Sequence, residues 1–186
     1  MKLLSALLIS LFIITGLSAQ DTKNTKESAK ENARIKKEER DKKIENEFRL
    51  TDELINSKSF VLEAQSLRNT RGVQVQVSTL LNFISIDSAD AILQIGSMSR
   101  SGFNGVGGIT EEGRISNWKV NKDEKRKSFN LFMTVQSKFN TYDITMFIDY
   151  SGHAEATITG LRAGRLTFTG DLVSRENSSI FKGQAH

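Results

Sequence analysis

Residues 128–150, SFNLFMTVQSKFNTYDITMFIDY, decide the fold of this protein, because apolar and polar side chains alternate along most of their length. The apolar positions are Phe129, Leu131, Met133 and Val135 in the first half, and Tyr142, Ile144, Met146 and Ile148 in the second. Successive side chains of a β-strand point to opposite faces of the sheet, so this period of two predicts two neighbouring, half-buried strands. The short polar connection between them predicts antiparallel pairing.

The same alternation continues on both sides of this pair. Further strands are predicted at residues 59–67, 73–77, 82–86, 91–96, 114–120, 154–159 and 165–173. The expected core positions of the last two are Ala154, Ala156, Ile158, Leu166, Phe168 and Leu172. The fold class we predict is mainly β: an N-terminal helix followed by a curled antiparallel sheet (a meander or half-barrel) of about eight strands.

Four apolar residues fall on the face of the sheet that is expected to be polar. They are Phe83, Ile92, Phe132 and Phe147. Either the sheet is covered at these positions, for example by the helix, or these side chains form a contact surface. The sequence favours the first alternative, since sheets commonly carry some apolar residues on their outer face.

The N-terminus has the three parts of a secretory signal peptide. Lys2 is followed by an almost wholly apolar run over residues 3–17, and small residues precede an expected cleavage site after Ala19. The alternative is a retained membrane anchor, but the run is shorter than the ~20 residues that a spanning helix needs. We therefore predict a periplasmic or secreted protein that meets the membrane only through this signal peptide before cleavage.

Residues 20–47 are predicted to form a charged helical extension, partly solvated. Strong helix formers dominate, and opposite charges lie four residues apart, as in Glu38 and Lys42. Apolar side chains gather only towards the end of the helix, at Ile44, Phe48, Leu50, Leu54 and Ile55. We expect this end to dock on a β-rich domain over residues 48–174 and to plug or cover its core, with a flexible tail over residues 175–186.

The composition excludes several classes of site. The chain has no cysteine, which rules out disulfides and thiolate metal sites. The formal net charge of +4 is small, and acidic residues are interspersed with basic ones, so no nucleic-acid partner is predicted. Of the two histidines, His153 follows a predicted turn and is expected to be solvated, so no metal site is predicted.

The segment GFNGVGG, residues 102–108, resembles a phosphate-binding loop only superficially. A phosphate loop ends in Gly-Lys-Ser/Thr and enters a helix, whereas here an acidic turn, Glu111 to Gly113, and a strand follow. The glycines are expected to serve backbone geometry through positive φ or close approach. Long loops often carry function, however, so the candidate ligand- or partner-binding residues are Phe103, Asn104, Gly105, Gly107, Gly108 and Trp118.

Several blocks of the sequence, taken in order, resemble one protein family. They are NSKSFVLEAQSL, NFISIDSADAILQIGS, GFNGVGGITEEGRISNWKV and LTFTGDLV, which together span most of residues 57–173. This pattern is similar to the bacterial family called domain of unknown function 4251. The resemblance implies a secreted or envelope-located, mostly-β domain behind a signal sequence. It implies no catalytic residue.

Two functions remain compatible with the sequence. The favoured one is a non-enzymatic envelope protein that binds an apolar or amphipathic ligand, or another envelope protein, because no nucleophile, base or metal set is recognisable. The alternative is a hydrolase that acts on envelope or extracellular polymers. No catalytic residue and no cofactor are predicted. A pocket lined by converging carboxylates would favour the hydrolase, whereas an apolar cavity would favour the binding protein.

Overall fold

The computed structural model describes residues 18–96, 108–161 and 164–183, which contain one helix and nine strands. The elements are α1 (Ser18–Ser57), β1 (Ser59–Asn69), β2 (Gln74–Gln76), β3 (Phe83–Asp87), β4 (Asp90–Ile95), β5 (Ile109–Asp123), β6 (Ser128–Ser137), β7 (Thr141–Asp149), β8 (His153–Leu161) and β9 (Gly164–Ser174). The chain divides into two compact units, Met1–Lys43 and Ile44–His186. The mainly β prediction with an N-terminal helix is confirmed.

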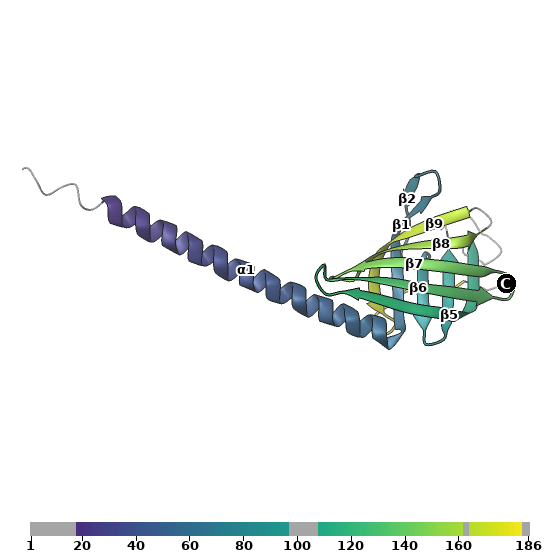
Figure 1. Ribbon diagram of the computed structural model, residues 1–186. Coiled ribbons are helices and arrows are strands. Elements are labelled where there is room, and N and C mark those ends of the chain that lie inside the picture. The colour runs from purple at the N-terminus through teal and green to yellow at the C-terminus, as the bar shows by residue number, and fades with distance from the viewer. Residues whose placement is uncertain (1–17, 97–107, 162–163, 184–186) are drawn as a thin grey trace, which may run out of the picture. The chain divides into compact units, whose positions relative to one another are not determined.

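The sheet is more closed than the predicted meander or half-barrel. Neighbouring strands pair antiparallel in the order β2-β1-β3-β4-β5-β6-β7-β8-β9, and β1 also pairs with β9 (Figure 1). Eight strands therefore form a closed barrel, because β1 bonds β3 along one edge and β9 along the other. β2 is an additional strand on the part of β1 that extends beyond β3.

Irregularities in the strand pairing help the sheet to curl. The register shifts between Ala64 and Ser66 in β1 and between Ser116 and Lys119 in β5. Such bulges bend a strand and increase its local twist. Bulges are hard to locate from the periodicity of a sequence. The β1–β9 ladder that closes the barrel joins residues about a hundred positions apart in the chain, and no local pattern predicts such a pairing. The sequence pattern therefore identified the strands but not their closure.

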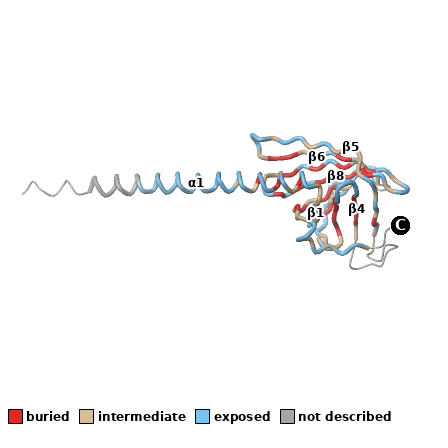
Figure 2. Tube along the Cα trace, turned by 90° about the horizontal axis from the view of Figure 1, so that it is seen from below, coloured by how far each residue is buried: buried red, intermediate tan, exposed pale blue. Residues whose placement is uncertain are grey.

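The predicted alternation of core residues is confirmed. The inward positions of β6, β7 and β8 are buried, and their outward neighbours are mostly exposed (Figure 2). Phe60 and Leu62 of β1 and Phe168 of β9 join the same apolar cluster, so the ladder that closes the barrel also closes its core.

The last turns of α1 pack against one end of the barrel core. Phe48 and Ile55 are buried, and the Phe48 ring stacks on Phe129 of β6 with 4.8 Å between centroids. The Thr51 hydroxyl donates a hydrogen bond to the carbonyl oxygen of Tyr150, 3.0 Å away. The predicted docking face is wrong at Leu50, which is 49% exposed, because Thr51 rather than Leu50 turns towards the barrel.

Two lysines from the other side of this contact hold the helix end in place. Lys122 of β5 pairs with Asp52 at 2.9 Å, and Lys127 pairs with Glu45 at 2.7 Å. Both ammonium groups also lie over the Phe48 ring, 4.8 Å from its centroid, where a cation is attracted to the aromatic face. Hydrogen bonds to Glu124 and Asp52 raise the pKa of Lys122 above its usual 10.5.

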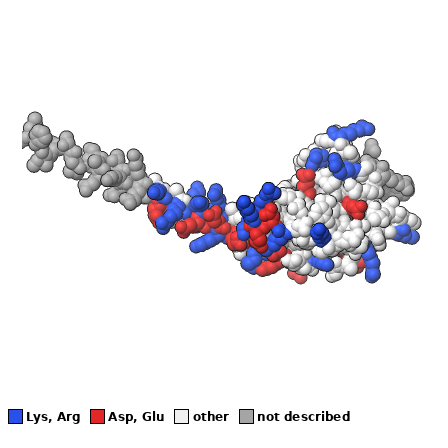
Figure 3. Space-filling model, in the orientation of Figure 1, with Lys and Arg blue, Asp and Glu red and all other residues white. Residues whose placement is uncertain are grey.

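The part of α1 before Ile44 belongs to the first compact unit and is rich in charged residues. Its side chains from residue 28 to residue 43 are exposed, and basic and acidic groups intermingle along it (Figure 3). Arg34 illustrates the pattern, since it pairs with Glu31 and Glu38 within the helix. Such pairs contribute only a few tenths of a kcal/mol each, roughly 0.2–0.5.

The four apolar residues of the outer face have different environments. Phe83 is fully buried, Ile92 is half-buried, and Phe132 and Phe147 are 38% and 48% exposed. Phe83 lies between Glu63 of β1 and Gln94 of β4 in the sheet. Both of these neighbours bond to the C-terminal segment, so that segment, and not the helix, crosses over Phe83.

The C-terminal segment over residues 175–183 makes defined contacts with the barrel. Ser178 donates to Glu63, and the Gln94 side chain bonds both the Phe181 carbonyl and the Gly183 amide. The buried amide group of Gln94 also donates to the Leu81 carbonyl and accepts from the Thr110 hydroxyl. A side chain that the alternation places outside the barrel is thereby covered and hydrogen-bonded.

Candidate functional site

A cavity of about 590 Å³ lies at the end of the barrel opposite the helix. The ends of β1, β4 and β8 and the beginnings of β5 and β9 surround it. Its described lining consists of Asn69, Ile95, Ile109, Glu111, Phe139, Asn140, Tyr142, Gly160, Leu161, Gly164, Arg165 and Leu166. The volume lies within the range of small-molecule sites, about 300–1,000 Å³.

Most of the side chains in this cavity are apolar. Ile95, Ile109 and Leu166 continue the inward stripes of the strands below them. Ile109 is 48% exposed and Phe139 is 68% exposed, so the apolar surface of the barrel core reaches solvent at this end. An eight-stranded barrel is just wide enough to be filled by side chains or to hold one small ligand, and here the filling is incomplete.

Among the described lining residues, Glu111 is the acidic one. The sequence places Glu111 and Glu112 in a turn, and this prediction is wrong, because β5 already begins at Ile109. Glu111 lies opposite Leu93, a core residue of β4, and therefore faces the interior of the barrel. Asn140, in the turn between β6 and β7, donates to its carboxylate across 3.3 Å.

Two glycines shape the rim. Gly160 has a φ of 96°, in the left-handed region, and a side chain at this position would meet the carbonyl oxygen of Thr141. Gly108 has no positive φ, but a methyl group on it would overlap the carbonyl oxygen of Ile95. At Gly108, the expected role in backbone geometry thus takes the form of close approach between strands.

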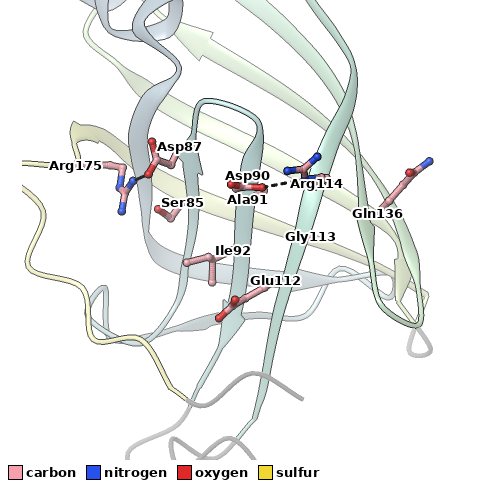
Figure 4. Close-up of a pocket in the computed structure, with 10 residues that line it drawn as sticks. All are labelled: Ser85, Asp87, Asp90, Ala91, Ile92, Glu112, Gly113, Arg114, Gln136 and Arg175. Atoms are coloured by element: carbon pink, nitrogen blue, oxygen red, sulfur yellow. Dashed lines mark hydrogen bonds and ion pairs between the residues drawn. The ribbon is translucent and has the colours of Figure 1, made fainter.

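A second cavity, of about 450 Å³, lies on the outer face of β3, β4 and β5 (Figure 4). Its carboxylates do not converge: Asp87 points to Arg175, and Asp90 points to Arg114 at 3.8 Å. Glu112, on the same face, pairs with Lys182 of the C-terminal segment. Each of these three carboxylates has a basic partner and is about half exposed or more. The described lining of this second cavity therefore forms surface ion pairs, and its carboxylates are not arranged to share a proton as a catalytic acid/base pair would.

His153 has a more specific environment than the solvated turn that the sequence predicts. It begins β8, and its Nδ1 lies 2.7 Å from a carboxylate oxygen of Asp171 in β9. A carboxylate orients the imidazole of a catalytic triad in the same way. Within the described residues, however, no serine or threonine hydroxyl bonds the ring, and the pair is about half exposed on the barrel surface.

The predicted site residues have different outcomes. Phe103, Asn104, Gly105 and Gly107 lie outside the described residues. Gly108 adjoins Ile109 at the cavity. Trp118 does not line it: the indole packs near the opposite end of the barrel, 6.4 Å from the Phe60 ring and under the Lys58 ammonium group.

The residues that sequence reasoning missed lie just beyond the glycine segment. The sequence predicts that Ile109 packs inwards but does not assign it to a site. Glu111 shares the parity of Ile109 and Ile115, so extending the strand backwards from residue 114 would have placed its carboxylate inside the barrel as well. Asn140 and Leu161 gave no such signal, because each lies at a turn or a strand end.

Metal binding and membrane insertion can also be judged from the described residues. In that part of the chain, no group of three or more His, Cys, Asp or Glu residues is arranged to hold a metal ion. Among the same residues, no helix is long and apolar enough to cross a membrane.

Comparison with known proteins places the chain in a family. The sequence profile of a domain of unknown function, DUF4251, matches residues 42–172. The chain belongs to this family. A crystal structure of a DUF4251 family protein from Bacteroides eggerthii DSM 20697 is similar in fold, with a TM-score of 0.60 and 25% sequence identity. The match covers 73% of this chain and 92% of the other.

The match to DUF4251 begins at residue 42, so it includes the docked end of the helix together with the barrel. It is broader than the sequence resemblance, which starts at residue 57. No curated protein matches this DUF4251 sequence significantly. The match thus spans the barrel strands and the docked end of the helix, and the family description names no activity.

Proposed function

We propose that this domain is a non-enzymatic binding protein of the cell envelope, which takes an apolar or amphipathic ligand, or the apolar segment of a partner protein, into the open end of its barrel. The observation that carries the proposal is the cavity of about 590 Å³ with apolar walls at the end opposite the helix. Apolar walls with a few polar groups are typical of small-molecule sites.

The arrangement of the barrel supports this function physically. Phe48 and the helix end fill one end of the core, and among the described residues the cavity lies at the other end, where a ligand can enter. Ligand binding there would cover the exposed apolar surface of Ile109 and Phe139. Burial stabilises by roughly 25 cal/mol for each Å² of apolar surface removed from water.

The binding of Nile red, an uncharged apolar dye, to the full chain tests the proposal. Ile109→Asn and Phe147→Asn form a matched pair, because both side chains are 48% exposed and only Ile109 lines the cavity. We expect Ile109→Asn to weaken dye binding about tenfold, the effect of losing roughly 1.4 kcal/mol, and Phe147→Asn to leave it unchanged.

Both variants keep the rest of the chain, so dye bound elsewhere contributes equally to them. Circular dichroism checks that both remain folded. Equal dye binding by Ile109→Asn and the parent protein would show that the cavity is not the site. No saturable dye binding by the parent would overturn the proposed function.

We also propose export, with cleavage after Ala19, on the basis of the apolar run over residues 3–17 and the small residues that follow it. Intact mass of the protein isolated from the envelope fraction of its host tests this proposal. A mass that begins at Gln20 is expected. A mass that retains Met1 to Ala19 would mean that the segment anchors the chain.

A further inference from the structure

The polar groups inside the cavity indicate which kind of amphipathic ligand it accepts. In the β4–β5 ladder, Ile95 lies opposite Ile109 and Leu93 opposite Glu111, so these residues share the inner face. The alternate pair, Gln94 and Thr110, faces outwards, where Thr110 donates to Gln94 across 3.1 Å. Glu111 is therefore the negatively charged group that the described strands present to the cavity.

Among the described residues, the carboxylate of Glu111 has one neutral partner. Asn140 donates to Oε1 across 3.3 Å, and in the described part of the chain no lysine or arginine pairs with either oxygen. The next residue, Glu112, differs in both respects: it points to the outer face and pairs with Lys182. Glu111 is also half-buried, so its charge is partly withdrawn from water, and none of the described residues supplies a compensating cation.

Arg165 lines the same cavity but is placed differently. It is exposed and alternates in β9 with Leu166, which packs against the core. By this alternation it shares the outer face with Thr167, whose hydroxyl lies 3.2 Å from that of Thr157. At this end of the barrel, the strand register therefore directs the Glu111 side chain to the inner face and the Arg165 side chain to the outer face.

We propose that the cavity binds a cationic amphiphile, with an apolar chain against Ile109, Tyr142 and Leu166 and an ammonium group at the Glu111 carboxylate. This inference rests on the proposed function and adds the charge of the ligand head group to it. Asn140 holds one carboxylate oxygen, and the other accepts a hydrogen bond from the ammonium. A charge-assisted bond in a partly dry site is roughly twice as strong as a neutral one.

Displacement of Nile red from the full chain by two single-chain probes, dodecylammonium and dodecanoate, tests the inference below their micellar concentrations. The parent protein is expected to bind dodecylammonium about tenfold more tightly than dodecanoate. Glu111→Gln should remove most of this preference while Nile red still binds. Glu112→Gln is the control, and it should retain the preference because Glu112 lies on the outer face.

The outcomes separate this inference from the function on which it rests. If Nile red binds but Glu111→Gln keeps the full preference for dodecylammonium, the head group does not meet Glu111 and the inference is wrong. If dodecanoate binds more tightly and Arg165→Gln weakens it, the ligand is an anion. If Nile red does not bind at all, the proposed function fails and this inference fails with it.

Discussion

At position 108 the barrel has no space for a side chain. Gly108 approaches the carbonyl group of Ile95 so closely that a methyl group would overlap the oxygen and the carbon behind it. The obstacle is backbone of the neighbouring strand and not the tip of a flexible side chain. The β4–β5 pairing begins beside this contact, at Ile95 and Ile109. Because glycine has no Cβ atom, Gly108 lets the two strands come close enough for the ladder to start there.

We expect Gly108→Ala to lower the free energy of unfolding by about 1–3 kcal/mol, because the two strands must move apart. Urea denaturation measures the change. Lys119→Ala is the control, since Lys119 is an exposed residue of β5 and its loss should have little effect. A urea unfolding curve of Gly108→Ala that equals the parent curve would contradict the close approach, and residues 102–108 would then have to be tested as a binding element.

The environment of Glu111 depends on where β5 begins and on its register against β4. A shift of one position in a strand moves every side chain to the other face of the sheet. If the strand began at residue 114, Glu111 would be a solvated turn residue. Because β5 begins at Ile109, the same carboxylate enters the barrel and its neighbour Glu112 pairs with Lys182 outside.

Among the elements, the end of α1 decides which end of the barrel is open. Phe48 enters the core beside Phe129, and Lys122 at the end of β5 and Lys127 in the β5–β6 turn form ion pairs with the helix. The ion pairs are partly exposed and contribute little individually. The buried aromatic contact is the larger contribution, since burying a phenylalanine side chain stabilises by roughly 1.5–3 kcal/mol.

We expect Phe48→Ala to destabilise the domain by about 3–5 kcal/mol, through lost burial and the cavity left in the core. Leu50→Ala, two residues later on the exposed face of the same helix, should change stability by less than about 0.5 kcal/mol. Urea denaturation of both variants measures the difference. Similar losses for the two would show that Leu50, as the sequence first indicates, packs on the barrel.

The C-terminal segment is an element without regular secondary structure that nevertheless covers part of the barrel. Gln94 is buried and forms hydrogen bonds with the backbone of Leu81, Phe181 and Gly183. This one side chain of β4 therefore connects the residues before β3 with the C-terminal segment. This contact explains why Phe83 is buried on the outer face. The sequence suggests flexibility over residues 175–186, since a polar tail without periodicity carries no signal for such a contact.

For the molecule as a whole, closure of the sheet joins the two halves of the domain. β1 lies between β3 and β9, so the beginning and the end of the β region are neighbours in one ladder. Every barrel strand then has two partners and no open edge along its paired length. Neither half of the chain could bury its inward face without the other.

A chain cut by an engineered protease site at Gly105 tests this interdependence. The two fragments, with β1 to β4 and β5 to β9, are expected to stay together on size-exclusion chromatography, because the β4–β5 and β1–β9 ladders both connect them. Once separated in urea and refolded alone, neither should unfold cooperatively. Two independently folded fragments would contradict the single closed core.

The sequence alone determined the strands, the inward residues of the core and the helix with its docked end, because these depend on local periodicity. A few neighbouring residues are enough to recognise the period of two at residues 128–150 and the helical spacing around Phe48. Closure of the barrel, the covering of Phe83 and the inward direction of Glu111 were decided only by tertiary structure. Each depends on contacts between separate segments: β1 with β9, Gln94 with Phe181, and Leu93 with Glu111. The parity of Ile115 extends to Glu111 only once the β4–β5 ladder shows that the strand begins before it.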